Sequence, residues 1–306
     1  MGRACRERPT AACEDRRMAA PDAEVELTEG LVRALLQEQH LDLADLPLVE
    51  VAAGWDNVIY RLGDAMSVRL PRRAMSAILI AHEQRWLPEL ADGLPLPIPV
   101  PLRSGAPGCG YPWPWTVGRW FPGRSAEQNP PEDLHLAARQ LGEFLAVLHR
   151  PAPADAPHNP HRGVPLAERS KRLVDGLDQL AGSVDRIQVM ERWASLVDTP
   201  AWSPPPLWLH GDVHPLNLLV HEGQLSAVID FGDLTAGDPA SDLAVGWMLF
   251  PPGPRDVFRA TAGVDQDSWA RAEAWALALG VAMANGDGRV AAIGRRTIGA
   301  VLADPG

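Results

Sequence analysis

The amino-acid sequence predicts an α+β protein of two lobes, in which a small antiparallel sheet precedes a larger, mainly helical lobe. Short strand-like stretches separated by turns lie early in the chain, at 48–53, 57–63 and 66–70. A proline-rich stretch over 92–114 excludes a helix there. Amphipathic helical patterns dominate the remainder of the chain. Sheet and helices are therefore segregated along the sequence, which is typical of α+β folds.

Two helices are expected beside the early strands. Leucines recur at helical spacing over 27–39 and predict the first helix. The second is expected over 74–91, after Pro71 ends the strands. Its apolar face would consist of Ile78, Leu79, Trp86, Leu87 and Leu90.

The N-terminal lobe is expected to end at Pro122-Gly123. The dense prolines of 92–114 favour extended edge segments and turns, and a strand is predicted over 115–121. We therefore assign residues 23–121 to the N-terminal lobe and 122–306 to the C-terminal lobe. Residues 1–22 are expected to be a disordered tail, with Met18 as an alternative start of the chain.

Helices account for most of the predicted C-terminal lobe. A compact β segment over 207–231 follows the triple proline 204–206 and stands among them. The helical patterns cover 131–149, 165–182, 185–197, 239–250, 254–262, 267–284 and 287–302.

Composition restricts the classes of partner. A net charge of −11 argues against nucleic acid and anionic membrane surfaces and suits a cationic small molecule. No apolar run reaches the length of about 18 residues that a membrane helix needs. Cys109 is the only cysteine outside the first 22 residues, so no disulfide framework is available and a reducing cytoplasm is expected.

The segment 207–233 carries the strongest chemical signal. It contains His210-Gly211-Asp212, then Asn217, then two short apolar strands joined by Glu222-Gly223, and it ends on Asp230-Phe231-Gly232-Asp233. Phosphoryl transfer requires positioning and neutralisation of charge more than covalent chemistry. A carboxylate must orient the incoming hydroxyl, and Mg²⁺ prefers oxygen ligands. The pattern therefore predicts Asp212 as the base and Asn217 with Asp230 as magnesium ligands, whereas the simpler alternative makes them turn residues.

This segment resembles the catalytic segment of aminoglycoside phosphotransferases and their relatives, which share the protein-kinase-like fold. Protein kinases carry Arg where this chain has Gly211. The run 237–244, Gly-Asp-Pro-Ala-Ser-Asp-Leu-Ala, is also similar to the family's sequence after the metal-binding Asp. Within it we expect Asp238 or Ser241 to cap a helix and Asp242 to be structural.

The resemblance extends into the N-terminal lobe and implies a nucleotide site there. Gly54 and Asn57 fall in a strand–turn–strand similar to the family's cover over the phosphates, although the glycines of the protein-kinase loop are absent. Arg69 occupies the position where the family usually has lysine, and Glu83 the position of its paired glutamate, with Glu89 as the rival.

The resemblance also implies how the base of the nucleotide is held. The backbone carbonyl of Arg119 and the N–H of Phe121 would contact it in the link between the lobes. The donor would be ATP or GTP with Mg²⁺.

The expected activity is transfer of the γ-phosphate to a hydroxyl of an antibiotic such as an aminoglycoside, giving resistance or self-protection. Two alternatives stay open. The acceptor can be a small metabolite of the choline, homoserine, methylthioribose or fructosamine type, or the chain can be an inactive nucleotide-binding relative. Asp233, Asp265, Asp267 and Glu273 are carboxylates that could face a cationic acceptor, and each is equally well explained as a solvated acid.

Overall fold

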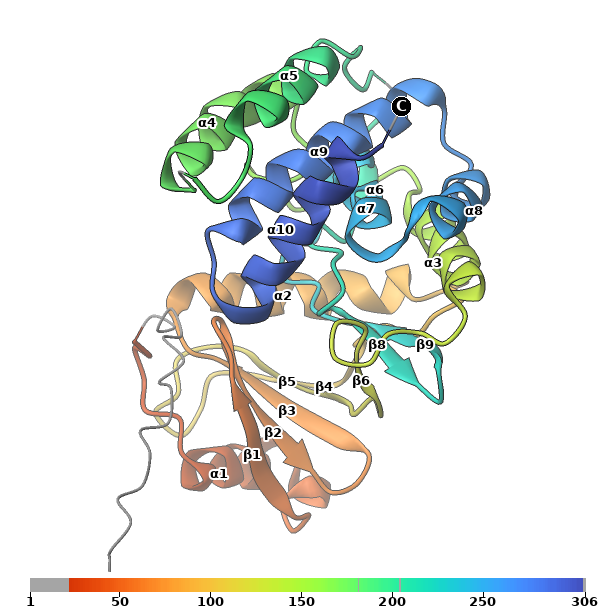
Figure 1. The fold of residues 1–306 in the computed structure, drawn as a ribbon. Helices are drawn as coiled ribbons and strands as arrows, with labels where there is room; N and C mark the ends of the chain where they lie inside the picture. The colour runs from red at the N-terminus through yellow and green to blue at the C-terminus, as the bar shows by residue number, and fades with distance from the viewer. Residues whose placement is uncertain (1–21, 181, 204, 305–306) are drawn as a thin grey trace, which may run out of the picture.

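The computed structural model describes residues 22–180, 182–203 and 205–304. The expected tail, 1–22, falls outside this range except for its last residue. Figure 1 shows two lobes, with the N-terminal lobe in red and orange below the green and blue helices of the C-terminal lobe. The predicted α+β architecture is confirmed.

An antiparallel sheet forms the body of the N-terminal lobe. Its strands follow the spatial order β1-β2-β3-β5-β4. Their bounds are β1 Leu48–Ala53, β2 Asn57–Leu62, β3 Met66–Pro71, β4 Pro101–Gly105 and β5 Trp115–Arg119. The proline-rich stretch supplies β4 at the sheet edge, where a missing N–H removes no ladder hydrogen bond. Helix α1 (Glu29–Gln39) packs on the sheet, and Thr28 caps it by accepting from Leu31 N at 3.2 Å.

Helix α2 (Ala74–Leu90) lies between the two lobes (Figure 1). Its first turns face the sheet, while Trp86, Leu87 and Leu90 belong to the apolar core of the C-terminal lobe. The predicted apolar face was wrong at Ile78, which is 58% exposed. Ile80 and Glu83 are buried instead, because the helix turns that side toward β3 and the interlobe contact.

The C-terminal lobe is built on helices with short β pairs. Helices α9 and α10 pack closely, since Gly294 brings its backbone against Ala284 and leaves no room for a Cβ atom. The helices of this lobe are α3 Leu134–Leu148, α4 Ser170–Gln179, α5 Arg186–Leu196, α6 Ala240–Leu243, α7 Val245–Leu249, α8 Pro252–Ala262, α9 Gln266–Ala284 and α10 Gly288–Leu302, with the 3-10 turn η2 Leu166–Arg169. The other 3-10 turn, η1 Leu41–Leu43, follows α1 in the N-terminal lobe.

The helix expected over 239–250 is two short helices. The chain tightens at Ala244, whose carbonyl accepts from Trp247 N at 3.2 Å in a three-residue step. The predicted 165–182 helix likewise begins as the 3-10 turn η2 before α4. The other predicted helices are present, and each of their ends lies within three residues of the predicted position.

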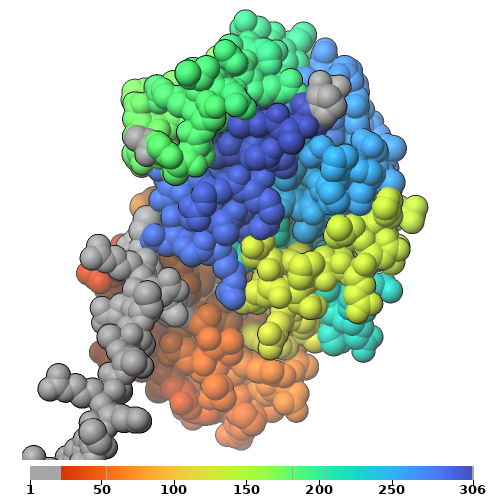
Figure 2. All heavy atoms as spheres, viewed as in Figure 1, coloured from red at the N-terminus to blue at the C-terminus, as the bar shows by residue number. Residues whose placement is uncertain are grey.

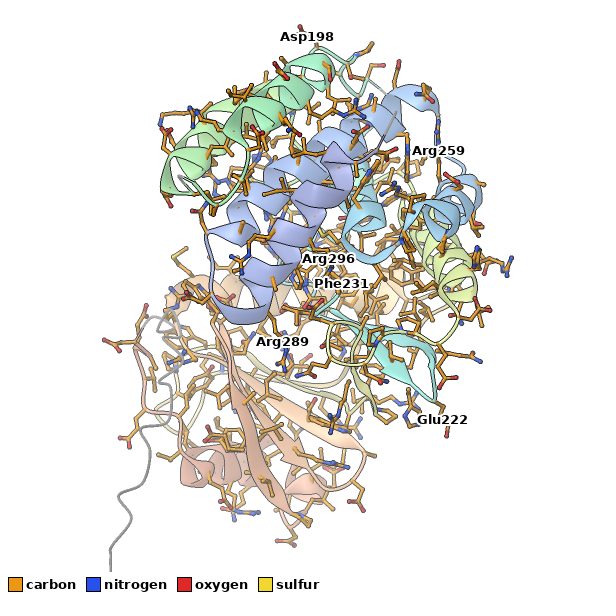
Figure 3. The ribbon with its side chains drawn as sticks, in the orientation of Figure 1. Asp198, Glu222, Phe231, Arg259, Arg289 and Arg296 are labelled. Atoms are coloured by element: carbon orange, nitrogen blue, oxygen red, sulfur yellow. The ribbon has the colours of Figure 1, made fainter. Side chains whose placement is uncertain are left out.

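Short β pairs carry the segment with the chemical signal. Strands β8 (Leu218–His221) and β9 (Gln224–Val228) form the predicted hairpin, and β6 (Arg124–Ser125) pairs with β8. Strand β7 (Leu207–Leu209) pairs with β10 (Thr235–Gly237), which closes the loop between them. Figure 3 places Glu222 at the outer tip of the hairpin and Phe231 near its inner end. Among the described residues, no helix is long and apolar enough to cross a membrane.

Candidate active site

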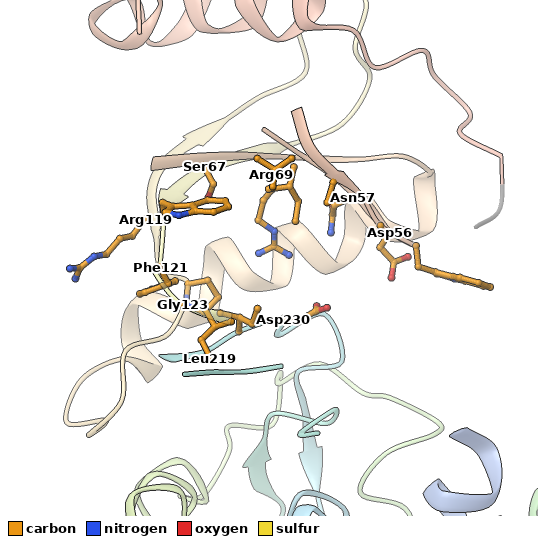
Figure 4. Close-up of a pocket in the computed structure, with 17 residues that line it drawn as sticks. Asp56, Asn57, Ser67, Arg69, Arg119, Phe121, Gly123, Leu219 and Asp230 are labelled. Carbon is orange, nitrogen blue, oxygen red and sulfur yellow. The ribbon is translucent and has the colours of Figure 1, made fainter. Parts of the chain in front are cut away.

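A cleft of about 340 Å³ lies between the N-terminal sheet and the β8–β9 hairpin (Figure 4). It contains five of the six predicted nucleotide-binding residues and the predicted metal ligand Asp230. Figure 2 shows the face on which the orange N-terminal lobe meets the yellow and blue surface of the other lobe. The cleft is lined by Val51, Ala52, Gly54, Trp55, Asp56, Asn57, Ile59, Ser67, Arg69, Pro99, Arg119, Trp120, Phe121, Gly123, Leu219, Ile229 and Asp230.

The turn between β1 and β2 covers one end of the cleft. Gly54 N donates to the carbonyl of Asn57 at 2.9 Å, which closes the turn. Its tip is tied to the start of α2, because Asp56 accepts from Ser76 Oγ at 2.7 Å and from Arg73 Nη2 at 3.1 Å. The Oδ1 atom of Asn57 is buried without a hydrogen-bond partner in the part of the chain described. A bound polar ligand would supply the missing partner.

Arg69 and Glu83 form a buried ion pair at the back of the cleft. Two parallel contacts join them, Nη1 to Oε2 at 2.7 Å and Nη2 to Oε1 at 3.2 Å. The side chain of Glu83 is only 1% exposed, and that of Arg69 is 13% exposed toward the cleft. Burial lowers the pKa of Arg69, but Glu83 and Asp230 outweigh it, so the pKa lies above its ordinary value. Of the two acids considered, the structure therefore pairs Arg69 with Glu83.

The link after β5 closes the opposite end of the cleft. Arg119 is the last residue of β5, and Trp120 N still donates to the carbonyl of Ala65 at 2.8 Å. Phe121 follows and lines the cleft, with the Arg119 guanidinium 5.9 Å from its ring centroid. Figure 4 shows Arg119 and Phe121 at one end and Asp56 at the other, with Arg69 between them.

The loop 210–217 is held rigidly under this cleft. Asp242 accepts from His210 N at 2.8 Å and Gly211 N at 2.9 Å, as expected of a structural carboxylate. The His210 ring accepts from Asp212 N at 3.1 Å through Nδ1 and contacts the Ile229 carbonyl at 3.0 Å through Nε2. Gly211 has φ +87°, and a Cβ atom there would lie 2.1 Å from the carbonyl oxygen of Asp233. These contacts fix the position of Asp212.

The hairpin brings Asn217 and Asp230 to the same place. Ile229 N donates to the Asn217 carbonyl at 2.9 Å, so Asn217 lies across the hairpin from Ile229, the residue directly before Asp230. Asn217 Nδ2 donates to the Asp212 carbonyl at 2.9 Å, which turns its Oδ1 atom away from that contact. Asp230 has φ +66° and an exposed carboxylate that makes no ion pair or hydrogen bond within the described ranges. One amide oxygen and one free carboxylate fit Mg²⁺, which takes its remaining ligands from phosphate and water.

Asp212 lies among basic side chains. Its Oδ2 atom is 3.2 Å from His214 Nε2, and its Oδ1 atom accepts from Arg162 Nη2 at 2.8 Å. Burial by itself raises the pKa of Asp212, but the hydrogen bond and charge of His214 and the charge of Arg162 outweigh it and bring the pKa well below its ordinary value. The carboxylate is therefore ionised at neutral pH.

Arg162 and Asp233 complete the site. Arg162 also contacts Asp233 Oδ2 at 3.1 Å and donates through Nε to the Gly211 carbonyl. Burial is the largest cause that raises the pKa of Asp233, Arg162 opposes it, and Asp212 adds to it. Arg162 was not predicted, because it lies 50 positions from Asp212 along the chain and no local pattern connects the two residues. The other three carboxylates that could face a cationic acceptor have different surroundings. Asp265 caps α9, Asp267 is exposed in the first turn of α9, and Glu273 pairs with Arg192.

Solved structures show the same fold at low identity. The GDP complex of wild-type aminoglycoside 2'-phosphotransferase-IIIa has a TM-score of 0.68 and 20% identity, and the match covers 90% of this chain and 99% of that one. An ADP-bound aminoglycoside phosphotransferase has a TM-score of 0.58 and 16% identity over 90% and 97%. The apoenzyme of macrolide 2'-phosphotransferase from Brachybacterium faecium has a TM-score of 0.58 and 22% identity over 90% and 98%.

The family model described as the phosphotransferase enzyme family matches residues 47–275. That range includes the whole cleft, the loop 210–217 and the hairpin. The resemblance drawn from the sequence and the predicted enzyme class are thereby confirmed. The chain belongs to the phosphotransferase enzyme family.

Proposed function

We propose that this enzyme transfers the γ-phosphate of ATP or GTP to a hydroxyl group of a small molecule. The observation that carries the proposal is the convergence of Asp212, Asn217 and Asp230 below a cleft that contains Arg69. An oriented carboxylate beside a pair of oxygen ligands is the arrangement that phosphoryl transfer needs. Residues 23–121 would hold most of the nucleotide, and residues 122–306 the acceptor.

In this proposal Asp212 orients the acceptor hydroxyl and takes its proton. The hydroxyl oxygen forms a bond to the γ-phosphorus, the bond from that phosphorus to the β–γ bridging oxygen breaks, and the nucleoside diphosphate leaves. The low pKa of Asp212 makes it a weak base toward a neutral alcohol. Proton transfer to Asp212 would therefore complete only after the bond to phosphorus has largely formed.

Asn217 and Asp230 would hold Mg²⁺. The ion, when bound, neutralises charge on the phosphate oxygens. Arg69 would contact the phosphates while Glu83 keeps its guanidinium in place. Gly54 and Asn57 would cover the phosphates from the β1–β2 turn. The Arg119 carbonyl and the Phe121 N–H would contact the base.

Two classes of acceptor are considered. The first is an antibiotic, as the names of the structural relatives suggest for those proteins, and its phosphorylation would give resistance or self-protection. The second is a small metabolite of the choline, homoserine, methylthioribose or fructosamine type. We place the reaction in the cytoplasm, where nucleoside triphosphates are abundant.

Coupled nucleotide turnover with Mg²⁺ tests the proposal. The acceptor panel contains aminoglycosides, macrolides and the small metabolites, each with ATP and with GTP. Wild type is compared with Asp212→Asn and with the control Asp198→Asn, which changes an exposed acid at the far end of the C-terminal lobe (Figure 3). We expect acceptor-dependent turnover in wild type and the control, and a loss of about a thousandfold or more in Asp212→Asn. Unchanged turnover in Asp212→Asn would refute the role of Asp212. Nucleotide binding with no turnover on any acceptor of the panel would favour an inactive relative.

A further inference from the structure

Arg169 is a buried guanidinium that lacks an anionic partner. The residue, at the end of η2, is only 5% exposed. Its Nε atom has no hydrogen-bond partner, and no carboxylate of the described residues lies within ion-pairing distance. Its guanidinium carbon lies 5.2 Å from the ring centroid of Trp275, a fully buried side chain of α9. Stacking on an aromatic ring offsets only part of the cost of burying a charge.

The other buried arginines of this lobe are paired. Arg255 is equally buried and lies 3.0 Å from Asp304. Arg271 is 4% exposed and donates through Nε to Asp238 Oδ2 at 2.7 Å. Each of these two buried guanidinium groups therefore has a carboxylate partner. The exception at Arg169 needs a different explanation, because an unpaired buried charge destabilises the fold.

Further positive charge surrounds Arg169. Arg172, one turn later on α4, is exposed and contacts His161 Nε2 at 3.3 Å. Burial, and after it the charges of Arg162 and Arg172, lower the pKa of Arg169 to about 10. The pKa of His161 is lowered by burial and then chiefly by Arg172. Arg162 has two acidic partners, Asp212 and Asp233, and both carboxylates are engaged by it.

This cluster lies beside the predicted catalytic base. Arg162 belongs to the segment 157–163, which is fastened to the catalytic loop. Asn159 N donates to Thr235 Oγ1 at 2.9 Å, and Asn159 Nδ2 donates to Asp233 Oδ1 at 2.9 Å. His161 lies in the same segment and contacts Arg172 of α4. Arg169 and Arg172 belong to the C-terminal lobe, and neither of them lines the nucleotide cleft.

We propose that Arg169 and Arg172 bind an anionic group, a carboxylate or a phosphate, carried by the acceptor. The proposal rests on the proposed function and narrows its substrate class to hydroxyl compounds with a negative charge. A planar guanidinium pairs with either oxyanion through two hydrogen bonds. The anion would compensate the buried charge of Arg169, so the site is complete only when the acceptor is bound. A polycationic aminoglycoside would be repelled by the same side chains.

Three compounds with one six-carbon polyol skeleton test the charge directly. Gluconate ends in a carboxylate, sorbitol in a hydroxyl and glucamine in an ammonium group, and glycerol 2-phosphate tests phosphate as the anion. Binding to the full chain is measured by calorimetry with a non-hydrolysable nucleotide present, so that Arg69 and the phosphate cleft are occupied. The readout does not require turnover, and failure of catalysis therefore leaves it intact.

We expect an anion to bind at least tenfold more tightly than sorbitol, and glucamine not to bind. Gluconate as the tighter anion would indicate a carboxylate acceptor, and glycerol 2-phosphate a phosphate acceptor. Arg172→Gln, an exposed change, should weaken the anion about tenfold or more. Arg169→Met should abolish the preference while raising the Tm of the free protein, because the unpaired charge is removed. The control Arg103→Gln changes an exposed arginine on β4 and should bind like wild type.

Three results would overturn the inference. The first is equal binding of gluconate, sorbitol and glucamine together with no binding of glycerol 2-phosphate. The second is anion binding that persists in both Arg169→Met and Arg172→Gln. The third is a cationic compound as the best acceptor in the turnover panel. The third result would leave the proposed phosphotransfer standing. Conversely, anion binding that is lost in both variants, in a protein without turnover on any acceptor, would support the site and reject the function.

Discussion

The ion pair between Arg69 and Glu83 permits a quantitative test of how the nucleotide cleft is built. Replacement by Arg69→Met leaves the Glu83 carboxylate buried, 1% exposed, without its cation. Breaking a buried pair from one side costs about 3–5 kcal/mol of the free energy of unfolding. The bidentate contacts at 2.7 and 3.2 Å place this pair in that class and not among surface pairs, which are worth about 0–1 kcal/mol.

The conservative change separates charge from geometry. Arg69→Lys keeps the positive charge, but an ammonium is a point donor that cannot match both carboxylate oxygens. The loss of one charge-assisted hydrogen bond predicts about 1.5–3 kcal/mol. The double variant Arg69→Met with Glu83→Gln removes both charges and should be more stable than Arg69→Met alone by about 1–3 kcal/mol.

Urea unfolding of wild type and the variants gives these differences as shifts of the midpoint at constant slope. Nucleotide affinity is measured in parallel, and we expect Arg69→Met to weaken it while the double variant does not recover it. The control is again Arg103→Gln, whose nearest acid, Asp42, is 3.9 Å away at an exposed site, and its effect should stay within about 0.5 kcal/mol. A cost below about 1 kcal/mol for Arg69→Met would show that the buried pair is not the constraint that we describe.

Three further outcomes are expected. Asp230→Asn removes the free carboxylate of the proposed metal site, and the Mg²⁺ concentration for half-maximal turnover should rise about tenfold or more; an unchanged magnesium requirement would contradict the assignment. The folded-state pKa of Asp212 is depressed, so its ion pairs contribute stability above the ordinary carboxyl pKa of about 3.9, and this stability is lost only as pH falls through the lower folded value. Asp212 therefore stays ionised between pH 7 and about 5, and turnover should be flat over that range. An acid limb of the turnover profile with a midpoint above about 5, shifted in Asp212→Glu, would argue against this. Gly211→Ala places a Cβ atom 2.1 Å from the Asp233 carbonyl oxygen and should lower the Tm and abolish turnover. Its control is Gly110→Ala, with φ +82° and no atom within 4 Å of the new Cβ atom, which should lower the free energy of unfolding by only about 1 kcal/mol. Equal effects of the two changes would show that the close approach at Gly211 is unimportant.

Local patterns in the sequence were sufficient for the two-lobed architecture and for the hairpin. The strand pattern of 218–220 and 225–229 with a Glu-Gly turn is read from neighbours along the chain, and the structure has β8 and β9 there. Because strand spacing and turn chemistry act over a few residues, they also place Asn217 beside the end of β9. The Arg69–Glu83 pair, predicted through the resemblance, follows from β3 being joined directly to α2.

The contacts that adjust the chemistry of Asp212 depend on tertiary structure. Arg162 reaches Asp212 across 50 positions, and Asp242 accepts from His210 N across 32. The contact of Arg162 follows from how the segment 157–163 is fastened to β10, and no periodic pattern along the chain indicates either contact. The exposure of Ile78 and the break at Ala244 were missed for the same reason, since packing of whole elements decides which side of a helix is buried.

The sequence by itself therefore determined which residues are the candidates for phosphoryl transfer, because that chemistry would require a few residue types at short, local spacing. Only the tertiary structure decided that Asp212 is held between His214 and Arg162 and that Arg169 lies buried without an anion. Both are properties of charge and burial, which arise when distant segments pack together and exclude water.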